Sequence, residues 1–428
     1  MMTPPESRPA HVYVGAEADG PSTDTSKISL SGWRRVTIGE IAVVGSGSTP
    51  DRTKDEFWNG DIPWITTGEI NYGVVEDSEE KVTHKAIEYG LRLFPAGSIL
   101  MAMYGQGATR GRIAELGIQA AINQNSCAII CNSEVVSKYI YYFLENNYNF
   151  IRGLSNGGGQ HNLNNGIVRE LEILLPPLPE QRKIAAILST WDDSLSTLTR
   201  LIAAKRQQKR ALAEQLLTGQ RRLNGFEGEW ETLRFGDVFI RITRRNIEGN
   251  EHALTISGTH GLIDQREFFN KRVAASDLSG YYLIRRGEFA YNKSYSAGYD
   301  FGAIKRLNLY SSGVVSTLYI CFALNRADAD SNFYEQFFEA NLLNEGISGI
   351  AQEGARNHGL LNVSVKDFFE LDLPFPPPPE QRAIAAVLST LDDEISALDR
   401  LQASVQEQKR GLMDALLTGR VRVNVEDA

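Results

Sequence analysis

Residues 179–190 read PEQRKIAAILST, and residues 379–390 read PEQRAIAAVLST. The offset of 200 positions continues without a gap to Leu216-Leu217-Thr218-Gly219 and Leu416-Leu417-Thr418-Gly419. Between 179–220 and 379–420 there are 25 identities in 42 positions. An identity this high at a fixed period marks an internal duplication, which dominates the organisation of the chain.

The duplicated blocks have the pattern of long helices. A proline cluster precedes each block, and proline is favoured in the first helical turn. Gly219 and Gly419 stand where a left-handed C-terminal cap is expected. Apolar residues then recur in steps of four and three over more than four heptads, which predicts a coiled-coil seam. The seam residues are Ile184, Leu188, Trp191, Leu195, Leu198 and Ile202 in the first block, and Ile384, Leu388, Leu391, Ile395 and Leu398 in the second.

The seam also predicts how the two helices pair. In an antiparallel pair whose facing positions sum to 600, Trp191 faces Lys409 and Lys209 faces Leu391. Lysine stems can lie along large apolar side chains, and Trp191 can make a cation–π contact with Lys409. A parallel pair would instead stack Lys209 on Lys409, so we predict the antiparallel pair. The alternative is that each helix packs separately on its own domain.

The segments outside the duplicated blocks diverge almost completely. Short apolar runs at 38–44, 97–103 and 287–291 predict strands, and 137–146 and 332–343 predict short helices. We therefore predict an α+β fold of two mixed α/β domains, joined by two long helices in an antiparallel coiled coil with pseudo-two-fold symmetry. The predicted boundaries are a disordered tail at 1–30, a first domain at 31–178, a first helix at 179–222, a second domain at 223–378 and a second helix at 379–428.

Composition and charge limit the classes of protein to which the chain can belong. The chain has 428 residues, with 44 Lys+Arg against 53 Asp+Glu and a formal net charge of −9. This acidic balance argues against a histone-like binder of nucleic acid but leaves room for local basic surfaces. Three cysteines cannot form a disulfide framework and fit a reducing compartment, and no membrane span or signal peptide is evident, so we expect a cytoplasmic protein.

Catalytic motifs are nearly missing from the sequence. Val43–Gly47 imitates a dinucleotide-binding loop but lacks its third glycine, no phosphate-binding GxxxxGK[ST] motif occurs, and the cysteines and histidines lack zinc spacing. Asp51 with Glu79-Glu80-Lys81 fits the loose pattern of a nuclease centre. The pattern is so permissive that we favour the interpretation that these residues are solvated charges on loops. We therefore expect neither a metal site nor a self-contained enzyme.

Basic residues gather instead on loops of the two divergent domains. Arginine, lysine, glutamine and tyrosine on loops suit the reading of base edges and the holding of phosphates. An ordinary solvated surface would explain either cluster alone equally well. The candidate DNA-contacting residues are Arg110, Arg112, Gln160, Arg244, Arg245, Lys293 and Tyr295.

Two divergent domains, each closed by a Pro-Pro-x-Pro-Glu-Gln-Arg helix that ends in Leu-Leu-Thr-Gly, resemble the specificity (S) subunit of type I restriction-modification enzymes. The resemblance covers nearly the whole chain after about residue 31. It implies a non-catalytic subunit whose two target recognition domains each read one half of a bipartite double-stranded DNA sequence. It also implies that the helices set the gap between the half-sites and dock two modification subunits, with restriction subunits in a complete system.

In that family S-adenosylmethionine, ATP and Mg²⁺ act on the partner subunits, so the resemblance implies that this chain binds no cofactor. The tail at 1–30 has no role in the family arrangement. A function of another class stays open, namely a scaffold whose two modules bind proteins rather than DNA. Salt dependence separates the two possibilities, because phosphate contacts weaken steeply with salt.

Overall fold

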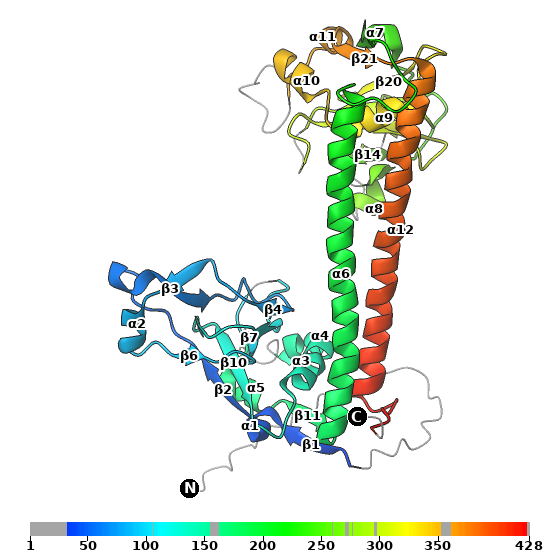
Figure 1. The fold of residues 1–428 in the computed structure, drawn as a ribbon. Helices are drawn as coiled ribbons and strands as arrows, with labels where there is room; N and C mark the ends of the chain where they lie inside the picture. Colours follow the sequence, from blue (N-terminus) through cyan, green and yellow to red (C-terminus); the bar gives the residue numbers. More distant parts are fainter. Residues whose placement is uncertain are drawn as a thin grey trace, which may run out of the picture. The chain divides into compact units, whose positions relative to one another are not determined.

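The computed structural model describes residues 32–105, 107–154, 162–258, 260–269, 274–275, 277–294, 298–351 and 361–425. The chain forms two compact units (Figure 1). Unit 1 combines residues 1–198 with 401–428, and unit 2 is the continuous segment Thr199–Arg400. Each unit contains one mixed α/β domain and one half of each long helix, so the predicted fold class is confirmed.

The domain of unit 1 is built on two sheets. The five-stranded sheet has the order β2 (Ala42–Ser46), β10 (Ser126–Cys131), β7 (Ile99–Ala102), β8 (Ile113–Leu116) and β4 (Val74–Val75). The four-stranded sheet has the order β5 (Glu80–Val82), β3 (Trp58–Ile65), β9 (Ala120–Ile122) and β6 (Leu93–Phe94). A separate ribbon pairs β1 (Arg34–Thr37) with β11 (Glu172–Leu175), the strand that leads into the first long helix.

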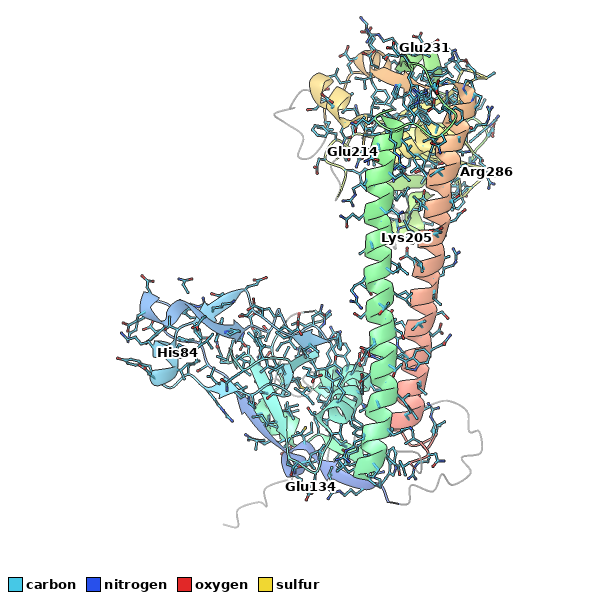
Figure 2. The ribbon with its side chains drawn as sticks, in the orientation of Figure 1. His84, Glu134, Lys205, Glu214, Glu231 and Arg286 are labelled. Carbon is cyan, nitrogen blue, oxygen red and sulfur yellow. The ribbon has the colours of Figure 1, made fainter. Side chains whose placement is uncertain are left out.

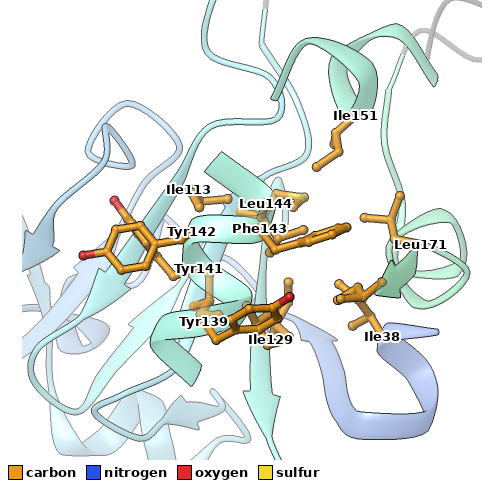
Figure 3. Packing of buried hydrophobic residues seen from close by; sticks show 14 of the residues in the cluster. Ile38, Ile113, Ile129, Tyr139, Tyr141, Tyr142, Phe143, Leu144, Ile151 and Leu171 are labelled. Atoms are coloured by element: carbon orange, nitrogen blue, oxygen red, sulfur yellow. The ribbon is translucent and has the colours of Figure 1, made fainter. Parts of the chain in front are cut away.

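The short helices of unit 1 are α1 (Ile38–Ile41), α2 (His84–Glu88), α3 (Ser137–Asn146), α4 (Tyr148–Gly153) and α5 (Asn165–Arg169). Helix α3 has the bounds that the sequence predicts, and it supplies the large buried side chains Tyr139, Tyr142 and Phe143 (Figure 3). The same core includes Ile184 and Leu188 from the first long helix and Leu416 from the second. The long helices are therefore part of the core of the domain rather than an appendage to it.

The predicted strand at 38–44 is wrong in its first half. Residues Ile38–Ile41 form helix α1, and the strand begins only at Ala42. The cause is a capping box, in which the backbone NH of Thr37 donates to the Glu40 carboxylate at 2.6 Å. A capping box satisfies donors that a helix start leaves open, and here it outweighs the β-branched composition of the segment.

Unit 2, like unit 1, combines a main sheet, two-stranded ribbons and short helices. Its main sheet has the order β13 (Phe239–Ile242), β20 (Ile320–Leu324), β17 (Phe289–Asn292) and β18 (Ala303–Arg306). The ribbons pair β12 (Glu231–Arg234) with β21 (Asp372–Phe375), β14 (Leu254–Ser257) with β15 (Gly261–Asp264), and β16 (Tyr282–Arg285) with β19 (Ser312–Val315). The helices are α7 (Phe235–Val238), α8 (Gln265–Phe269), α9 (Ser331–Glu339), α10 (Asn344–Ile350) and α11 (Val365–Phe369).

Phenylalanine dominates the core of unit 2. Phe235, Phe239 and Phe322 contact one another with ring centroids 4.7 to 5.1 Å apart. Ala213, Leu216 and Ile384 of the long helices belong to the same cluster. Both domains thus use the helix pair as one wall of their core.

The long helices are α6 (Leu178–Leu217) and α12 (Pro378–Leu417), each of forty residues. Within each unit their halves run antiparallel, as predicted. In unit 2, Lys209 forms an ion pair with Asp392 at 2.6 Å and Lys205 with Glu394 at 2.7 Å. In unit 1, Lys409 forms an ion pair with Asp192 at 2.7 Å. These partner positions sum to 599 or 601, close to the predicted sum of 600.

The seam residues of the described helices are buried or half-buried, whereas Leu201 and Leu401, which lie outside the seam, are exposed. Lys409 is 6% exposed and lies over the ring of Tyr142 at 5.2 Å. The aromatic ring that lies against the Lys409 ammonium therefore belongs to Tyr142 of α3. The ammonium forms an ion pair with Asp192, the neighbour of Trp191. Lys409 is thus a place where α3 contacts the helix pair, and in unit 2 Gln336 of α9 donates to Asp392, the partner of Lys209, at 2.8 Å.

The ends of the helices are held by reciprocal anchors. Glu180, in the first turn of α6, accepts hydrogen bonds from the Trp33 indole at 3.0 Å and from Arg422, which follows the end of α12. Glu380, in the first turn of α12, accepts equivalent bonds from Trp230 at 3.0 Å and from Arg222, which follows the end of α6. Gly219 and Gly419 end the helices with φ of 73° and 72°, as the sequence predicts.

Candidate nucleic-acid interface

Each unit presents one hairpin loop at the position of the predicted DNA contacts. The first loop, 103–112, joins β7 to β8, and Gly111 NH donates to Ala102 O at 2.8 Å. The second loop, 293–302, joins β17 to β18, where Asn292 pairs with Ala303. The two loops therefore occupy equivalent places in two different sheets, although their sequences share almost nothing.

In each unit, a leucine that precedes the last short helix of the domain bonds through its backbone to the base of the same loop. In unit 1, Leu163 NH donates to Met103 O at 3.0 Å. In unit 2, Leu361 NH donates to Lys293 O at 2.9 Å. Gln160 and Tyr295, two of the candidate residues, lie outside the described residues. The backbone that follows Gln160 nevertheless meets the loop that carries Arg110 and Arg112.

The loop of unit 1 is anchored from two sides. Arg112 Nη1 donates to Asn71 Oδ1 at 2.7 Å, and the Tyr148 hydroxyl donates to Ala108 O at 2.6 Å. Tyr104 remains 48% exposed, and Arg110 is half-buried. Of the candidate arginines, Arg112 is thus already engaged in positioning the loop, and Tyr104 adds an exposed aromatic ring that the sequence analysis did not single out.

The candidates of unit 2 differ in how their charges are compensated. Arg244 donates two hydrogen bonds to the Glu288 carboxylate, at 2.7 and 2.8 Å, so its charge is largely neutralised within the domain. Arg245 donates to Gly280 O and lies over the Tyr282 ring at 5.1 Å. Lys293 is half-buried at the start of the loop, and burial lowers its pKa.

The nuclease-like carboxylates are not assembled into a centre. Glu80 pairs with Arg52, which also lies over the Trp58 ring at 3.9 Å. Asp51 accepts a hydrogen bond from the Thr53 hydroxyl at 2.7 Å, and this bond holds the Asp51 pKa below its ordinary value. In the described residues no three His, Cys, Asp or Glu side chains are grouped to hold a metal ion.

The thiols have the character of core residues. Burial raises the pKa of Cys127 and of Cys321 to about 12, and that of Cys131 to about 11. A thiol with such a pKa carries almost no thiolate at neutral pH and is a poor nucleophile. Neither forty-residue helix, nor any other helix in the described parts of the chain, has the apolar run needed to cross a membrane.

Comparison with known proteins gives consistent matches. Residues 30–206 match the family model of the type I restriction modification DNA specificity domain. The MjaIX specificity subunit of Methanocaldococcus jannaschii is 34% identical over 202 residues, which are 46% of this chain and 44% of that relative. The chain thus spans less than half the length of this relative.

Two further matches cover almost the whole chain. The MjaVIII specificity subunit of the same organism is 23% identical over 416 residues, 91% of this chain and 93% of that relative. The crystal structure of the S subunit of the type I restriction-modification system from M. genitalium superposes with a TM-score of 0.54 at 14% identity. It covers 90% of this chain and 96% of that one, and at this identity the likeness concerns the fold.

Proposed function

Because the chain belongs to the family of type I restriction-modification specificity subunits, we propose that it reads a DNA sequence in two parts, one part with each recognition domain. In this proposal the loop at 103–112 reads one half-site and the loop at 293–302 reads the other. The chain performs no chemistry itself. It brings modification subunits, which carry S-adenosylmethionine, and in a complete system ATP- and Mg²⁺-dependent restriction subunits, to the DNA.

One observation carries the proposal. Both units attach their domain to the helix pair through the same anchor, with Glu180 and Trp33 in one and Glu380 and Trp230 in the other. The recognition loops, in contrast, have unlike sequences and unlike contacts. A bipartite, asymmetric target requires two domains that are attached to the helix pair in the same way but carry different recognition loops. The attachment then stays constant while the bases that the loops contact can differ.

The test is a map of modified bases. The chain is expressed with the modification subunits of its own system in a host that lacks them, and the genome is sequenced for methylated bases. We expect two half-sites at a fixed separation. A chain with residues 103–112 replaced by glycine and serine should lose or relax one half-site and keep the other. A single continuous motif, or loss of both halves together, would contradict the proposal.

The salt dependence of binding separates this function from that of a protein-binding scaffold. For a DNA-binding complex, the logarithm of the affinity should fall linearly with the logarithm of the salt concentration, because the protein releases counterions from the phosphates that it contacts. A scaffold would show no affinity for DNA to measure.

A further inference from the structure

Each unit contains a cavity between its domain and the helix pair. The cavity of unit 1 has a volume of about 580 Å³, and its lining includes Glu145, Tyr148, Lys409 and Arg410. The cavity of unit 2 has a volume of about 400 Å³ and is lined by residues that include Lys209, Arg210, Glu214 and Glu339. The two lysine–arginine pairs are the same positions of the duplicated helix, so the cavities are equivalent.

Both cavities adjoin the recognition loop of their unit. In unit 1, Tyr148 lines the cavity, and its hydroxyl holds the loop at Ala108 O. In unit 2, Glu339 lines the cavity and accepts a hydrogen bond at 3.1 Å from Tyr299, which belongs to the loop. Asn341, next to the lining residues Ala340 and Leu342, donates to Gly298 O of the same loop at 3.3 Å. In each unit the wall of the cavity and the recognition loop are therefore directly hydrogen-bonded.

The charges in the cavity of unit 1 leave one cation uncompensated. Lys409 takes up both nearby carboxylates, Asp192 at 2.7 Å and Glu145 at 3.2 Å. Arg410 is exposed, and no carboxylate among the described residues pairs with it. Two acidic residues lie within about one turn of Arg410 on its own helix: Glu407, which forms no ion pair with it in the described residues, and Asp414, which is paired with Arg420.

The charges in the cavity of unit 2 are arranged in a similar way. Lys209 pairs with Asp392, and Glu339 pairs with the buried Lys305 at 2.6 Å. Arg210 is exposed like Arg410. Its helix carries Glu214 one turn further on, a carboxylate that also lines this cavity and is visible on α6 in Figure 2. Arg210, like Arg410, thus has one acidic residue close to it on its own helix that forms no ion pair with it in the described residues.

We propose that Arg410 and Arg210 each bind a phosphate of the DNA backbone beside the half-site that the neighbouring loop reads. This inference rests on the proposed function and assigns a DNA contact to the helix pair itself. A guanidinium is always charged and binds phosphate through two parallel hydrogen bonds, and an arginine without a carboxylate partner keeps those donors available. Phosphate contacts fix the position of a protein on the duplex, which a loop that reads bases requires.

The test measures DNA binding by the full chain in complex with its modification subunits, using fluorescence anisotropy. One duplex carries the motif from the genome map and a second has both half-sites scrambled, and each is titrated at several salt concentrations. Arg410→Ala should weaken binding to both duplexes about three- to tenfold and reduce the slope of log affinity against log salt by about one. Arg210→Ala should have a similar effect, and Glu214→Gln should strengthen binding, because it removes a negative charge close to Arg210.

Arg382→Ala and Arg182→Ala are matched controls. Both arginines are exposed on the same two helices and neither lines either of these two cavities, so the salt slope should stay unchanged. Size-exclusion chromatography of each variant checks that the complex still assembles. A wild-type salt slope in Arg410→Ala overturns the inference, with or without a loss of assembly, while the proposed function stands. If the wild-type complex itself shows no preference for the motif, the proposed function fails instead.

Discussion

Arg222 and Glu380 form an ion pair at 2.6 Å, although 158 positions separate them in the chain. The Glu380 carboxylate is fully buried and also accepts the Trp230 indole NH at 3.0 Å. The pair ties the end of α6 to the start of α12 inside unit 2. Arg422 and Glu180 repeat the arrangement in unit 1.

Glu380→Gln should destabilise the chain by about 2–3 kcal/mol, because Arg222 then loses a charged partner in a largely desolvated place. Urea unfolding of the full chain measures the change. The control is Glu370→Gln, whose carboxylate is exposed and lies 3.9 Å from Lys366, and which should cost less than about 0.5 kcal/mol. Equal effects of the two substitutions would show that the anchor adds nothing to stability.

Glu145 should make stability depend on pH. Burial raises its pKa above the ordinary value, with the nearby Lys409 opposing the shift. A carboxyl group whose pKa is raised on folding favours the folded state while it is protonated, and that contribution is lost as pH rises through the folded-state pKa. From pH 4 to pH 7, the stability of wild type relative to Glu145→Gln should therefore fall.

Urea unfolding at each pH gives this difference. Glu335 provides a parallel case in unit 2, since burial raises its pKa as well, and Glu335→Gln should behave in the same direction. A difference that stays constant or grows with pH would contradict the assignment for Glu145.

Substitutions in the recognition loops should act on one half-site each. Arg110→Ala or Arg112→Ala should weaken recognition of one half, and Lys293→Ala or Tyr295→Ala recognition of the other. A lost base contact costs about 1–3 kcal/mol, whereas a lost phosphate contact weakens all sequences alike. Binding to duplexes with either half-site scrambled measures the effect, and unchanged binding in all four variants would show that other loops read the DNA.

Tyr148→Phe isolates the positioning of the first loop. It removes the hydrogen bond to Ala108 O and leaves the ring in place. We expect reduced discrimination at the half-site of unit 1 and no change at the other. Tyr89→Phe, at an exposed position remote from the loop in sequence, serves as the control.

The helix pair should act as a ruler. One heptad inserted into α6 near residue 200 and one into α12 near residue 400 keeps the seam matched, and it lengthens each helix by roughly 10 Å at 1.5 Å per residue. At about 3.4 Å per base pair, the gap between half-sites should grow by about three base pairs while the half-sites stay the same. A methylation map of the double-insertion variant measures the gap. Changed half-sites with an unchanged gap would contradict the ruler.

Insertion of the heptad into only one helix is the companion experiment. The seam then has no matching partner register, so the chain should be destabilised rather than re-spaced. A stable single-insertion protein with a shifted gap would mean that the pairing of the helices does not determine the separation.

The helices were predictable because their signal is a repeated period. Forty residues with a heptad pattern, proline at the start and glycine at the end allow one structure, and α6 and α12 follow it. The contacts across the seam were harder to predict from the sequence. The charge of Lys409 goes to Asp192 and Glu145, and Glu145 comes from α3, whose approach no periodicity encodes.

The anchors and the cavities could not be predicted from the sequence. Glu180 and Arg422 are 242 positions apart, and their pairing depends on the antiparallel register together with the chain path after Gly419. The recognition loops could be predicted in part. The clustering of basic residues on loops identified Arg110, Arg112 and Arg244 as candidates, but only the structure shows that Arg112 is held by Asn71 and that Arg244 is neutralised by Glu288.

The division of the units has a consequence for synthesis on the ribosome. Unit 2 is continuous, so residues 199–400 can complete their core as soon as they have emerged. The domain of unit 1 is translated before unit 2, yet its core needs Met413, Leu416 and Leu417, which emerge only after unit 2. The first domain to leave the ribosome is therefore the last to finish folding, and until then it exposes the apolar surface that α12 will cover. A released chain truncated after residue 400 should hold a protease-resistant unit 2 and a protease-sensitive domain of unit 1.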